Sequence, residues 1–519
     1  MKKRDTLFFG TLFYLLLPNL LFLTAWLRPG LGWSLAGLLL LVAWLQYRLN
    51  QPPTLLNRLS QRGRAGMLLL AFFYCVLAGI GEIGRQKSDY DKHNLMVHDL
   101  IQLNQPIVYD NDNYNDPLLC YYIGYYLPTA FAAKLTGGLA VARWWSMAWG
   151  GLGLYLIFNW LHRLHHPYGW WAAGLFFIVG GLDVLIHTFW VWQYWFDGSV
   201  SRLFKEYFFE KAQGFKFYIP PHVTLTNELT ENRLDMPAPF TQLQWAPQHA
   251  LGGWLSAALV MCQILEYRTS RLIVLVAALT LLWSPFVTIG LLPFLVWAFI
   301  KLGWQNFVSS ANLVGGLIGL TVTAYYLAHL PQQYFSLLFI HFQNVRDLAL
   351  YLVFMTGHVG VCGLILYFLK KRKVLSTERI QLAWCAIIGV ILFSLVCMGK
   401  YNDFLMRTIL PAQWVLLPTL AFGLAELWRR RQWRSLGILG VCLLIGAYYP
   451  LRETAISLWN LSRPPQIKRS IVRAVSNFGE ADVSRISRDS TAPGTDFAAQ
   501  YLGRRDSFFG RYLMKQPVP

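Results

Sequence analysis

Two carboxylates and an imidazole stand close together in the sequence, a few residues after a strongly apolar run. One residue separates Asp89 from Asp91, Tyr90 lies between them, and His93 follows two positions later. A carboxylate at a membrane surface beside a dry cleft can accept a proton from an attacking hydroxyl, because partial desolvation raises its basicity. Asp, Asn and Tyr clusters are also ordinary turn residues, so a structural interpretation stays open. We predict Asp89 and Asp91 as candidate catalytic bases, with Tyr90 and His93 as substrate ligands.

A second candidate segment lies where a later apolar run begins. Pro247 is followed directly by Gln248 and His249. Proline suits the first position of a helix, so Gln248 and His249 are expected in its first turn, where free backbone N–H groups and the positive dipole end favour an anion. We predict both as ligands of an anion. A belt of Trp and His at the membrane interface is the alternative interpretation.

Cations stand in a third segment, a short polar turn between two apolar runs. Lys400 and Arg407 flank Asp403 there, and Arg346 precedes Asp347 at a similar place earlier in the chain. A cation at the start of a span is costly unless it is paired, so a phosphate or Asp403 is the natural partner of Arg407. We predict Lys400 and Arg407 as ligands of a phosphate and Arg346 as a substrate ligand. Structural pairing with Asp403 remains the alternative.

The sequence offers no comparable pattern for a metal or another cofactor. His162, His165 and His166 resemble a metal cluster, but they stand in a basic turn without carboxylates. The seven cysteines lie almost all inside apolar runs and show neither a CxxC nor a Cys/His ligand spacing. We therefore expect no cofactor, no histidine or cysteine metal cluster and no disulfide framework, while the sequence leaves a divalent metal requirement open.

The elements that must position these candidate residues are membrane-spanning helices. Only 14% of the 519 residues are charged, whereas 55% are apolar and 16% are aromatic. Uncharged runs of about twenty residues recur along the whole chain, each long enough to cross a hydrocarbon core of roughly 30 Å. The composition predicts an all-α polytopic membrane protein and excludes a soluble enzyme, a secreted disulfide scaffold and a disordered chain. The net charge of +19 is attributed mostly to membrane topology, so no nucleic-acid partner is expected.

Basic residues collect in short polar turns that alternate with two large polar loops. By the positive-inside rule the basic turns face the cytoplasm, and loops 82–138 and 188–247 face outside. Within the first loop, Leu118–Gly138 is expected to lie along the membrane as an interfacial helix, because counting it as a span inverts every later loop. The chain then divides into a transmembrane domain, residues 1–450, and an extracytoplasmic tail, residues 451–519.

About thirteen spans follow from this arrangement. The runs around 271–300 are short, so 11 to 13 spans are possible. The thirteen are expected near residues 6–26, 32–47, 65–81, 139–161, 169–187, 249–266, 271–284, 286–300, 311–329, 348–369, 381–398, 409–427 and 435–450. The acids Asp89 and Asp91 then follow the third span directly.

This layout resembles the GT-C superfamily of integral-membrane glycosyltransferases. The resemblance rests on Asp89 and Asp91 after the third span, on the interfacial segment Tyr121–Lys134, and on Ala142-Arg143-Trp144 at the opening of the next span. Members share an acidic residue in the first large external loop, helices lying on the membrane in that loop, and many spans. The resemblance implies transfer of a sugar from a polyprenyl-phosphate donor, with an acidic residue as base. It also implies that the donor phosphate is held by Lys400, Arg407, Gln248 and His249.

The expected function is therefore an inverting glycosyltransferase in a bacterial inner membrane, with its active site facing the exterior. Its partners would be the lipid-linked donor, membrane lipids, and a glycan, lipid or protein acceptor. The chain shows no glycine-rich nucleotide loop, which agrees with a donor that is already activated in the membrane. The alternative is a flippase for lipid-linked oligosaccharides or another transporter, which predicts charged residues in the middle of spans.

Overall fold

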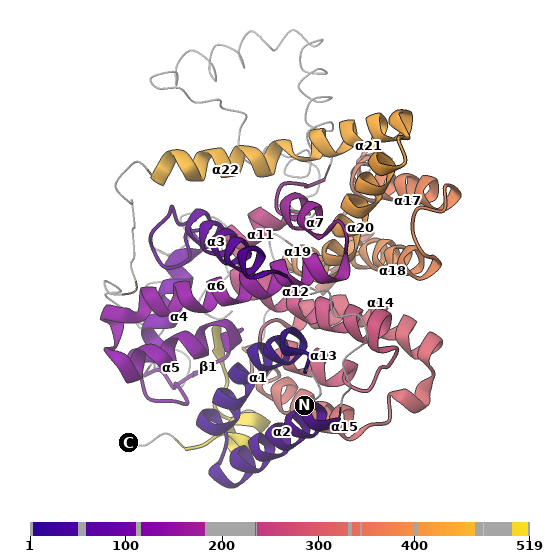
Figure 1. Ribbon diagram of the computed structural model, residues 1–519. Helices are drawn as coiled ribbons and strands as arrows, with labels where there is room; N and C mark the ends of the chain where they lie inside the picture. The colour runs from indigo at the N-terminus through magenta and orange to yellow at the C-terminus, as the bar shows by residue number, and fades with distance from the viewer. Residues whose placement is uncertain are drawn as a thin grey trace.

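The computed structural model describes residues 4–49, 59–110, 116–181, 234, 236–330, 335–342, 345–398, 402–461, 471 and 501–516. Within these ranges the chain is almost entirely helical (Figure 1). The first helices are α1 (Thr6–Trp26), α2 (Pro29–Leu49), α3 (Gln61–Leu77), α4 (Tyr90–Gln102), α5 (Tyr126–Thr136), α6 (Leu139–Leu164) and α7 (Gly169–Phe176). The central helices are α11 (Pro239–Trp245), α12 (Pro247–Cys262), α13 (Ile273–Leu281), α14 (Pro285–Leu302), α15 (Ser310–Tyr326) and α16 (Val345–Met355). The last are α17 (Val361–Lys371), α18 (Thr377–Ser394), α19 (Asp403–Thr408), α20 (Leu410–Arg429), α21 (Trp433–Gly446) and α22 (Tyr448–Leu461).

Four short strands form two small antiparallel sheets in the described part of the chain. The strands are β1 (Leu118–Leu119), β2 (Phe335–Leu337), β3 (Val396–Met398) and β4 (Leu502–Gly503). Strand β1 pairs with β4, and β2 pairs with β3. Both sheets join segments that are far apart in the sequence, so they tie the ends of helices together.

The protein is an all-α polytopic membrane protein. Among the described residues, seven helices are long and apolar enough to cross a membrane, or eight if the bent pair of α21 and α22 is counted as one span. The seven cover Thr6–Trp26, Pro29–Arg48, Pro247–Tyr267, Pro285–Leu302, Asp347–Lys371, Thr377–Ser394 and Leu410–Arg429. This count supports membrane insertion but falls short of the thirteen spans expected from the sequence. Part of the difference is helix length, because α3 and α15 have 17 residues each and α13 has nine.

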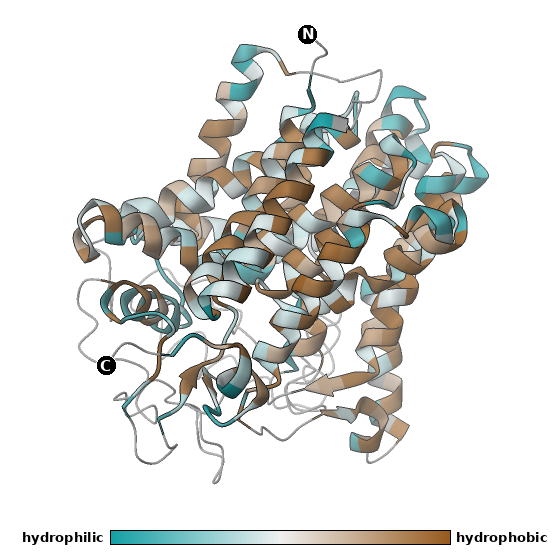
Figure 2. Ribbon diagram, turned by 90° about the horizontal axis from the view of Figure 1, so that it is seen from below, coloured by the Kyte–Doolittle hydropathy of each residue, from teal (hydrophilic) through white to brown (hydrophobic). Residues whose placement is uncertain are grey.

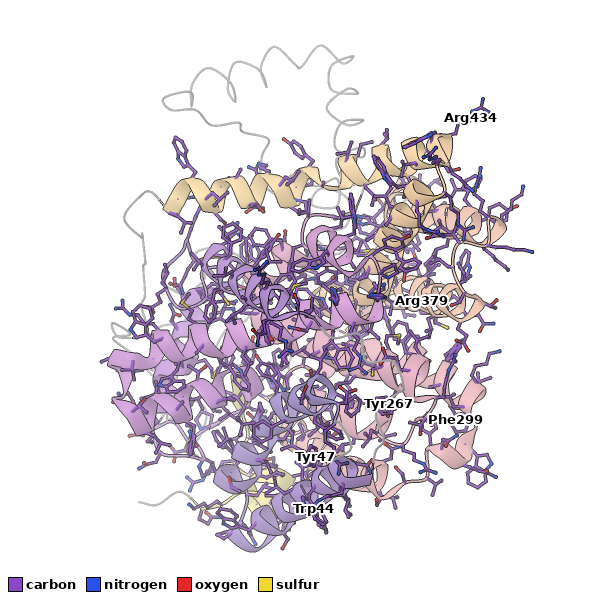
Figure 3. The ribbon with its side chains drawn as sticks, in the orientation of Figure 1. Trp44, Tyr47, Tyr267, Phe299, Arg379 and Arg434 are labelled. Atoms are coloured by element: carbon purple, nitrogen blue, oxygen red, sulfur yellow. The ribbon has the colours of Figure 1, made fainter. Side chains whose placement is uncertain are left out.

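The basic turns lie together at one end of the helix bundle. Arg4 donates to the carbonyl of Arg48 at 2.9 Å, and Arg379 donates to the carbonyl of Leu164. Hydrophilic ribbon gathers at the end where the N-terminus lies, and the short strands lie toward the other end (Figure 2). Arg379 points into the body of the protein, whereas Arg434 projects from its surface (Figure 3). Helix ends that the sequence assigns to one side of the membrane therefore share one face.

A buried ion cluster joins three helices at this basic end. The guanidinium of Arg163, in α6, donates to both carboxylate oxygens of Asp5 at 2.7 Å and to Glu266 at 2.5 Å. The hydroxyl of Tyr267 also donates to Asp5, at 2.9 Å. Because Arg163 is buried, the charges around it must be paired for the cluster to stabilise the fold.

Replacing one carboxylate of this cluster is expected to destabilise the protein. Glu266→Gln presents an amide N–H₂ group to Arg163, so it should lower the free energy of unfolding by about 1.5–3 kcal/mol, the range for a hydrogen bond to a charged group. The matched control is Glu378→Gln, which removes an exposed pair with Arg268 and should cost about 0–1 kcal/mol. Denaturant unfolding in detergent measures both values. Equal losses in the two variants would contradict the structural role of the cluster.

The segment that the sequence places along the membrane contains a short helix. Helix α5 has 11 residues, so at a rise of 1.5 Å per residue it is about 16 Å long, well below the thickness of the hydrocarbon core. It ends at Gly137 (φ 145°) and Gly138 (φ 65°), positive angles that favour glycine and let the chain turn directly into α6. The helix is therefore too short to be a span and forms a hairpin with α6.

Candidate functional site

Helix α4 carries the acidic motif next to a sharp change of chain direction. Gly79 (φ 81°) and Gly81 (φ 80°) turn the backbone after α3, and α4 begins at Tyr90. Asp89 immediately precedes the helix, and its carboxylate lies 3.0 Å from the ammonium of Lys92, one helical turn later. Asp89 thus has a cationic partner that the sequence analysis did not assign to the site.

His93 fixes α4 against two other elements. Its Nε2 lies 2.9 Å from the carbonyl of Trp245, in α11, and its Nδ1 lies 2.5 Å from the hydroxyl of Tyr126, in α5. A carbonyl can only accept, so Nε2 carries the proton and Nδ1 accepts from the tyrosine. Burial lowers the pKa of His93 to about 4, so its ring is neutral at physiological pH. Both ring nitrogens are used within the protein, which makes His93 a positioning residue in this structure.

Arg407 lies in α19, which follows a tight turn. Asn402, at a φ of 49°, accepts from the backbone N–H of Met398 and donates to the carbonyl of Val396, which fixes the start of α19 after β3. The guanidinium of Arg407 is largely buried, with 10% of its side chain exposed. It donates to Asp403 at 3.1 Å. This pairing is the structural alternative that the sequence left open, and it is present in the structure.

A second partner of Arg407 comes from α11. The guanidinium donates to Oε1 of Gln242 at 2.8 Å, while the amide of Gln242 donates to the carbonyl of Met406 at 2.6 Å. The Nε atom of Arg407 is buried and has no hydrogen-bond partner among the described residues. Arg407 is therefore held in place by protein groups and still has donor capacity for a ligand.

The predicted helix start at Pro247 is present in the structure. Pro247 begins α12, and Gln248 and His249 occupy its first turn with exposed fractions of 2% and 3%. The ring of Tyr122 packs at a steep angle on the ring of His249, with centroids 4.9 Å apart. Oε1 of Gln248 and Nδ1 of His249 are buried without a hydrogen-bond partner within the described ranges. Unpartnered buried polar atoms at a helix N-terminus indicate a place where a ligand or water is bound.

Helix α11 brings these segments together, because its Trp245 carbonyl accepts from His93 of α4 and its Gln242 accepts from Arg407 of α19. Burial by itself raises the pKa of Asp89, but Lys92, and to a lesser extent His93 and Arg407, outweigh it and hold the pKa below its usual value. Burial likewise opposes the charge on Lys92, but Asp89 and Asp403 raise its pKa. The site therefore holds two carboxylates, Asp89 and Asp403, and two cations, Lys92 and Arg407, brought by α4 and α19.

Tyrosine rings line the same site. The ring of Tyr121 stacks near Tyr122, with centroids 4.4 Å apart, and near Tyr501, at 4.6 Å. Burial raises the pKa of Tyr501, and the neighbouring charges of Asp89 and Asp403 raise it further. Tyr501 belongs to the segment that the sequence analysis treats as a tail. The polar composition of that segment gives no signal that one of its residues reaches the acidic motif.

The other predicted site residues take different positions. Asp91 is half-buried in the first turn of α4. Tyr90 is buried with its ring against His93, and its hydroxyl has no hydrogen-bond partner in the part of the chain that the structure describes. Lys400 lies outside the described residues, and Arg346 is described only as backbone within α16. Of the predicted site residues, the candidate site contains Asp89, Arg407, Gln248 and His249.

The described residues contain no group of three or more His, Cys, Asp or Glu side chains that could hold a metal ion. In comparisons with known proteins, no family model, curated sequence or solved structure matches the chain. A functional conclusion therefore rests on the geometry of the site and on its position in a membrane protein.

Proposed function

We propose that the protein is a GT-C-type inverting glycosyltransferase that transfers a sugar from a polyprenyl-phosphate donor to an acceptor hydroxyl. One observation carries the proposal. The segments that carry Asp89 and Arg407 are far apart in the sequence, yet both are held by α11, through His93 and the Trp245 carbonyl and through Arg407 and Gln242. A base and a phosphate-binding cation close together, in a protein embedded in the membrane, suit a substrate whose lipid tail keeps its phosphate at headgroup height.

The proposed reaction gives separate roles to Asp89 and to the two cations, Arg407 and Lys92. Asp89 accepts the proton of the acceptor hydroxyl as its oxygen attacks the anomeric carbon. The bond between that carbon and the phosphate oxygen breaks, and the configuration inverts. Arg407 and Lys92 neutralise the negative charge that grows on the departing lipid phosphate. Gln248 and His249 supply unpartnered side-chain atoms at the start of α12, where the positive end of the helix dipole favours an anion.

Binding of the donor also prepares the base. In the free protein, Lys92 and Arg407 hold the pKa of Asp89 low, which makes its carboxylate a weak proton acceptor. A bound phosphate neutralises the two cations and removes that effect, so the basicity of Asp89 rises when the donor is in place. This coupling favours an order of events in which the donor binds before the proton is transferred.

The distribution of charge favours an enzyme over a transporter. In the described candidate spans, charged residues lie at the helix ends, as with Lys301 in α14, Glu378 in α18 and Glu426 in α20. A transport pathway requires polar or charged groups along the middle of the spans. The proposed setting is a bacterial inner membrane with the site facing the exterior, and the acceptor is a glycan, a lipid or a protein.

A binding experiment tests the site independently of turnover. Purified protein is titrated with polyprenyl phosphate and, as a control, with the corresponding polyprenol, and its thermal unfolding is followed. A specific ligand present at one hundred times its Kd stabilises a protein by about 2.7 kcal/mol. We expect stabilisation by the phosphate and little by the alcohol. Equal stabilisation by both lipids would contradict a phosphate site.

Removing the internal competitor of the phosphate should strengthen this binding. Asp403 occupies one face of the Arg407 guanidinium, and 52% of its side chain is exposed. Asp403→Asn should therefore lower the Kd for polyprenyl phosphate by up to about fivefold, the equivalent of one exposed ion pair. Asp116→Asn is the matched control, because Asp116 pairs with Arg505 at 3.6 Å and is not one of the charged groups of the candidate site. Weaker binding in Asp403→Asn would mean that Asp403 itself contacts the ligand.

A further inference from the structure

The chain returns to the candidate site near its C-terminus, through residues 501–516. The backbone carbonyl of Tyr501 accepts from the N–H of Cys120 at 2.9 Å, and β4 then pairs with β1 in the register Leu118 to Gly503. Further along, the N–H of Lys515 donates to the carbonyl of Trp26 at 2.8 Å. Backbone hydrogen bonds therefore fix both ends of this segment to the helical body.

A buried aromatic cluster anchors the middle of the segment. Phe509 is fully buried against Phe22, in α1, and Tyr325, in α15, with ring centroids 6.2 and 5.3 Å away. The hydroxyl of Tyr325 accepts from the N–H of Tyr121 at 2.9 Å and donates to the carbonyl of Leu119 at 3.0 Å. The C-terminal segment and the tyrosine-rich segment after β1 are therefore both held by Tyr325.

Tyr501 links the C-terminal segment to the residues of the candidate site. Its side chain is only 1% exposed, and its ring lies 4.6 Å from that of Tyr121, with which its hydroxyl forms a hydrogen bond. The carboxylates of Asp89 and Asp403 are close enough to act on it electrostatically. Tyr121 is half-buried and packs 4.4 Å from Tyr122, whose ring lies 4.9 Å from that of His249 in α12. Tyr501 packs against Tyr121, where it can fix the position of Tyr121.

We propose that the C-terminal segment is part of the active site and that Tyr501 is a positioning residue, which holds Tyr121 against the Asp89 and Lys92 pair. The contact itself is independent of the reaction, whereas its effect on turnover rests on the proposed function. Tyr501 acts through Tyr121, so its loss should disturb the alignment of the base more than the binding of the phosphate.

The test compares two substitutions in the same segment. Tyr501→Phe removes only the hydroxyl, and the matched control Tyr512→Phe changes a side chain that is 59% exposed. We expect kcat to fall about tenfold in Tyr501→Phe, the size of one hydrogen-bonded positioning contact of about 1.4 kcal/mol. The KM for the donor should stay within about twofold, since Arg407 is untouched, and Tyr512→Phe should match the wild type. A Tyr501→Phe variant with wild-type kcat would overturn the positioning role.

A spectroscopic readout separates this inference from the proposed function. With 3-fluorotyrosine placed at position 121, the fluorine resonance should shift in Tyr501→Phe and remain in place in Tyr512→Phe. That result without any transferase turnover would preserve the contact and reject the proposed function. An unchanged resonance in Tyr501→Phe would overturn the inference even in an active transferase. Tyr501→Ala is expected to reproduce the shift, and unfolding temperatures of all three variants check that the fold is intact.

Discussion

Asp89→Asn is expected to lower turnover by about 10²–10⁴-fold, the usual contribution of general-base catalysis, while binding of polyprenyl phosphate persists. The substitution keeps the shape of the side chain and removes its ability to accept a proton. Asp89 is the acid of the motif that interacts with both Lys92 and Arg407, so we assign it the role of base ahead of Asp91.

Two controls accompany this prediction. Asp110→Asn changes an exposed carboxylate in the same loop and should leave turnover unchanged. Asp91→Asn should have a smaller effect than Asp89→Asn, because the phosphate-binding cation acts on Asp89. Steady-state kinetics over a range of acceptor concentrations measure all three variants. Full activity in Asp89→Asn would remove the reason for regarding this loop as catalytic.

The acid side of the pH profile follows from the charges around Asp89. A base must be deprotonated, so kcat/KM falls as the pH drops through the pKa of Asp89 in the free protein. Because Lys92 and Arg407 lower that pKa, activity should persist to a more acidic pH than an ordinary aspartate allows. Donor binding neutralises these cations, so the corresponding limb of kcat should lie at higher pH.

Arg407→Ala is expected to lower kcat/KM by about 10²–10³-fold, the typical loss when one preorganised donor to a developing negative charge is removed. The change leaves the lipid phosphate without its buried guanidinium and also frees Gln242 and Asp403. Arg407→Lys should recover only part of the activity, because an ammonium keeps the charge but not the planar pair of donors. The exposed Arg505, replaced by alanine, serves as the control cation.

A purely structural Arg407 predicts a different pattern. Its pairs with Asp403 and Gln242 would then stabilise the fold alone, and Arg407→Ala would lower the unfolding temperature without changing the preference for polyprenyl phosphate over polyprenol. Measuring lipid preference and thermal stability on the same sample distinguishes the two roles.

Sequence reasoning located much of the site because a membrane restricts where polar groups can gather. Asp89, His249 and Arg407 all stand near the ends of apolar runs, and helix ends on one side of a bilayer lie at one level. That argument predicts the depth of each residue in the membrane, but it does not predict which helices lie beside one another. The ion pair with Lys92 and the hydrogen bond from Arg407 to Gln242 depend on how distant helices pack, which no local spacing reveals.

The interpretation of His93 and of the tail changed for related reasons. The sequence marks His93 as a polar residue beside the acids, whereas the partners that occupy both its nitrogens come from α5 and α11. The polar composition of residues 451–519 predicts that they do not cross the membrane, but it contains no information about docking. Strand β4, only two residues long, is too short to be recognised by periodicity.

The last expected span corresponds to a bent pair of helices in the structure. The run near 435–450 corresponds to α21, and the helical path then bends by 45° into α22. In Figure 1, α22 crosses the top of the view beside α21. Its Glu453 pairs with Lys87 at 2.6 Å, while Leu451 and Leu458 are exposed. Helix α22 thus has polar residues toward the protein and apolar residues on the outside. Its amino-acid composition resembles that of a segment that lies in water.

Release of polyprenyl phosphate is the most direct test of the central claim that Asp89 and Arg407 form one glycosyl-transfer site. Purified protein in lipid is incubated with polyprenyl-phosphate sugars and candidate acceptors, and the freed lipid phosphate and the anomeric configuration of the product are measured. We predict release with inversion by the wild type and none by Asp89→Asn. The contrary result is that folded protein binds polyprenyl phosphate and moves the intact donor across the vesicle membrane without releasing the lipid phosphate. That result would contradict the claim and identify a transporter.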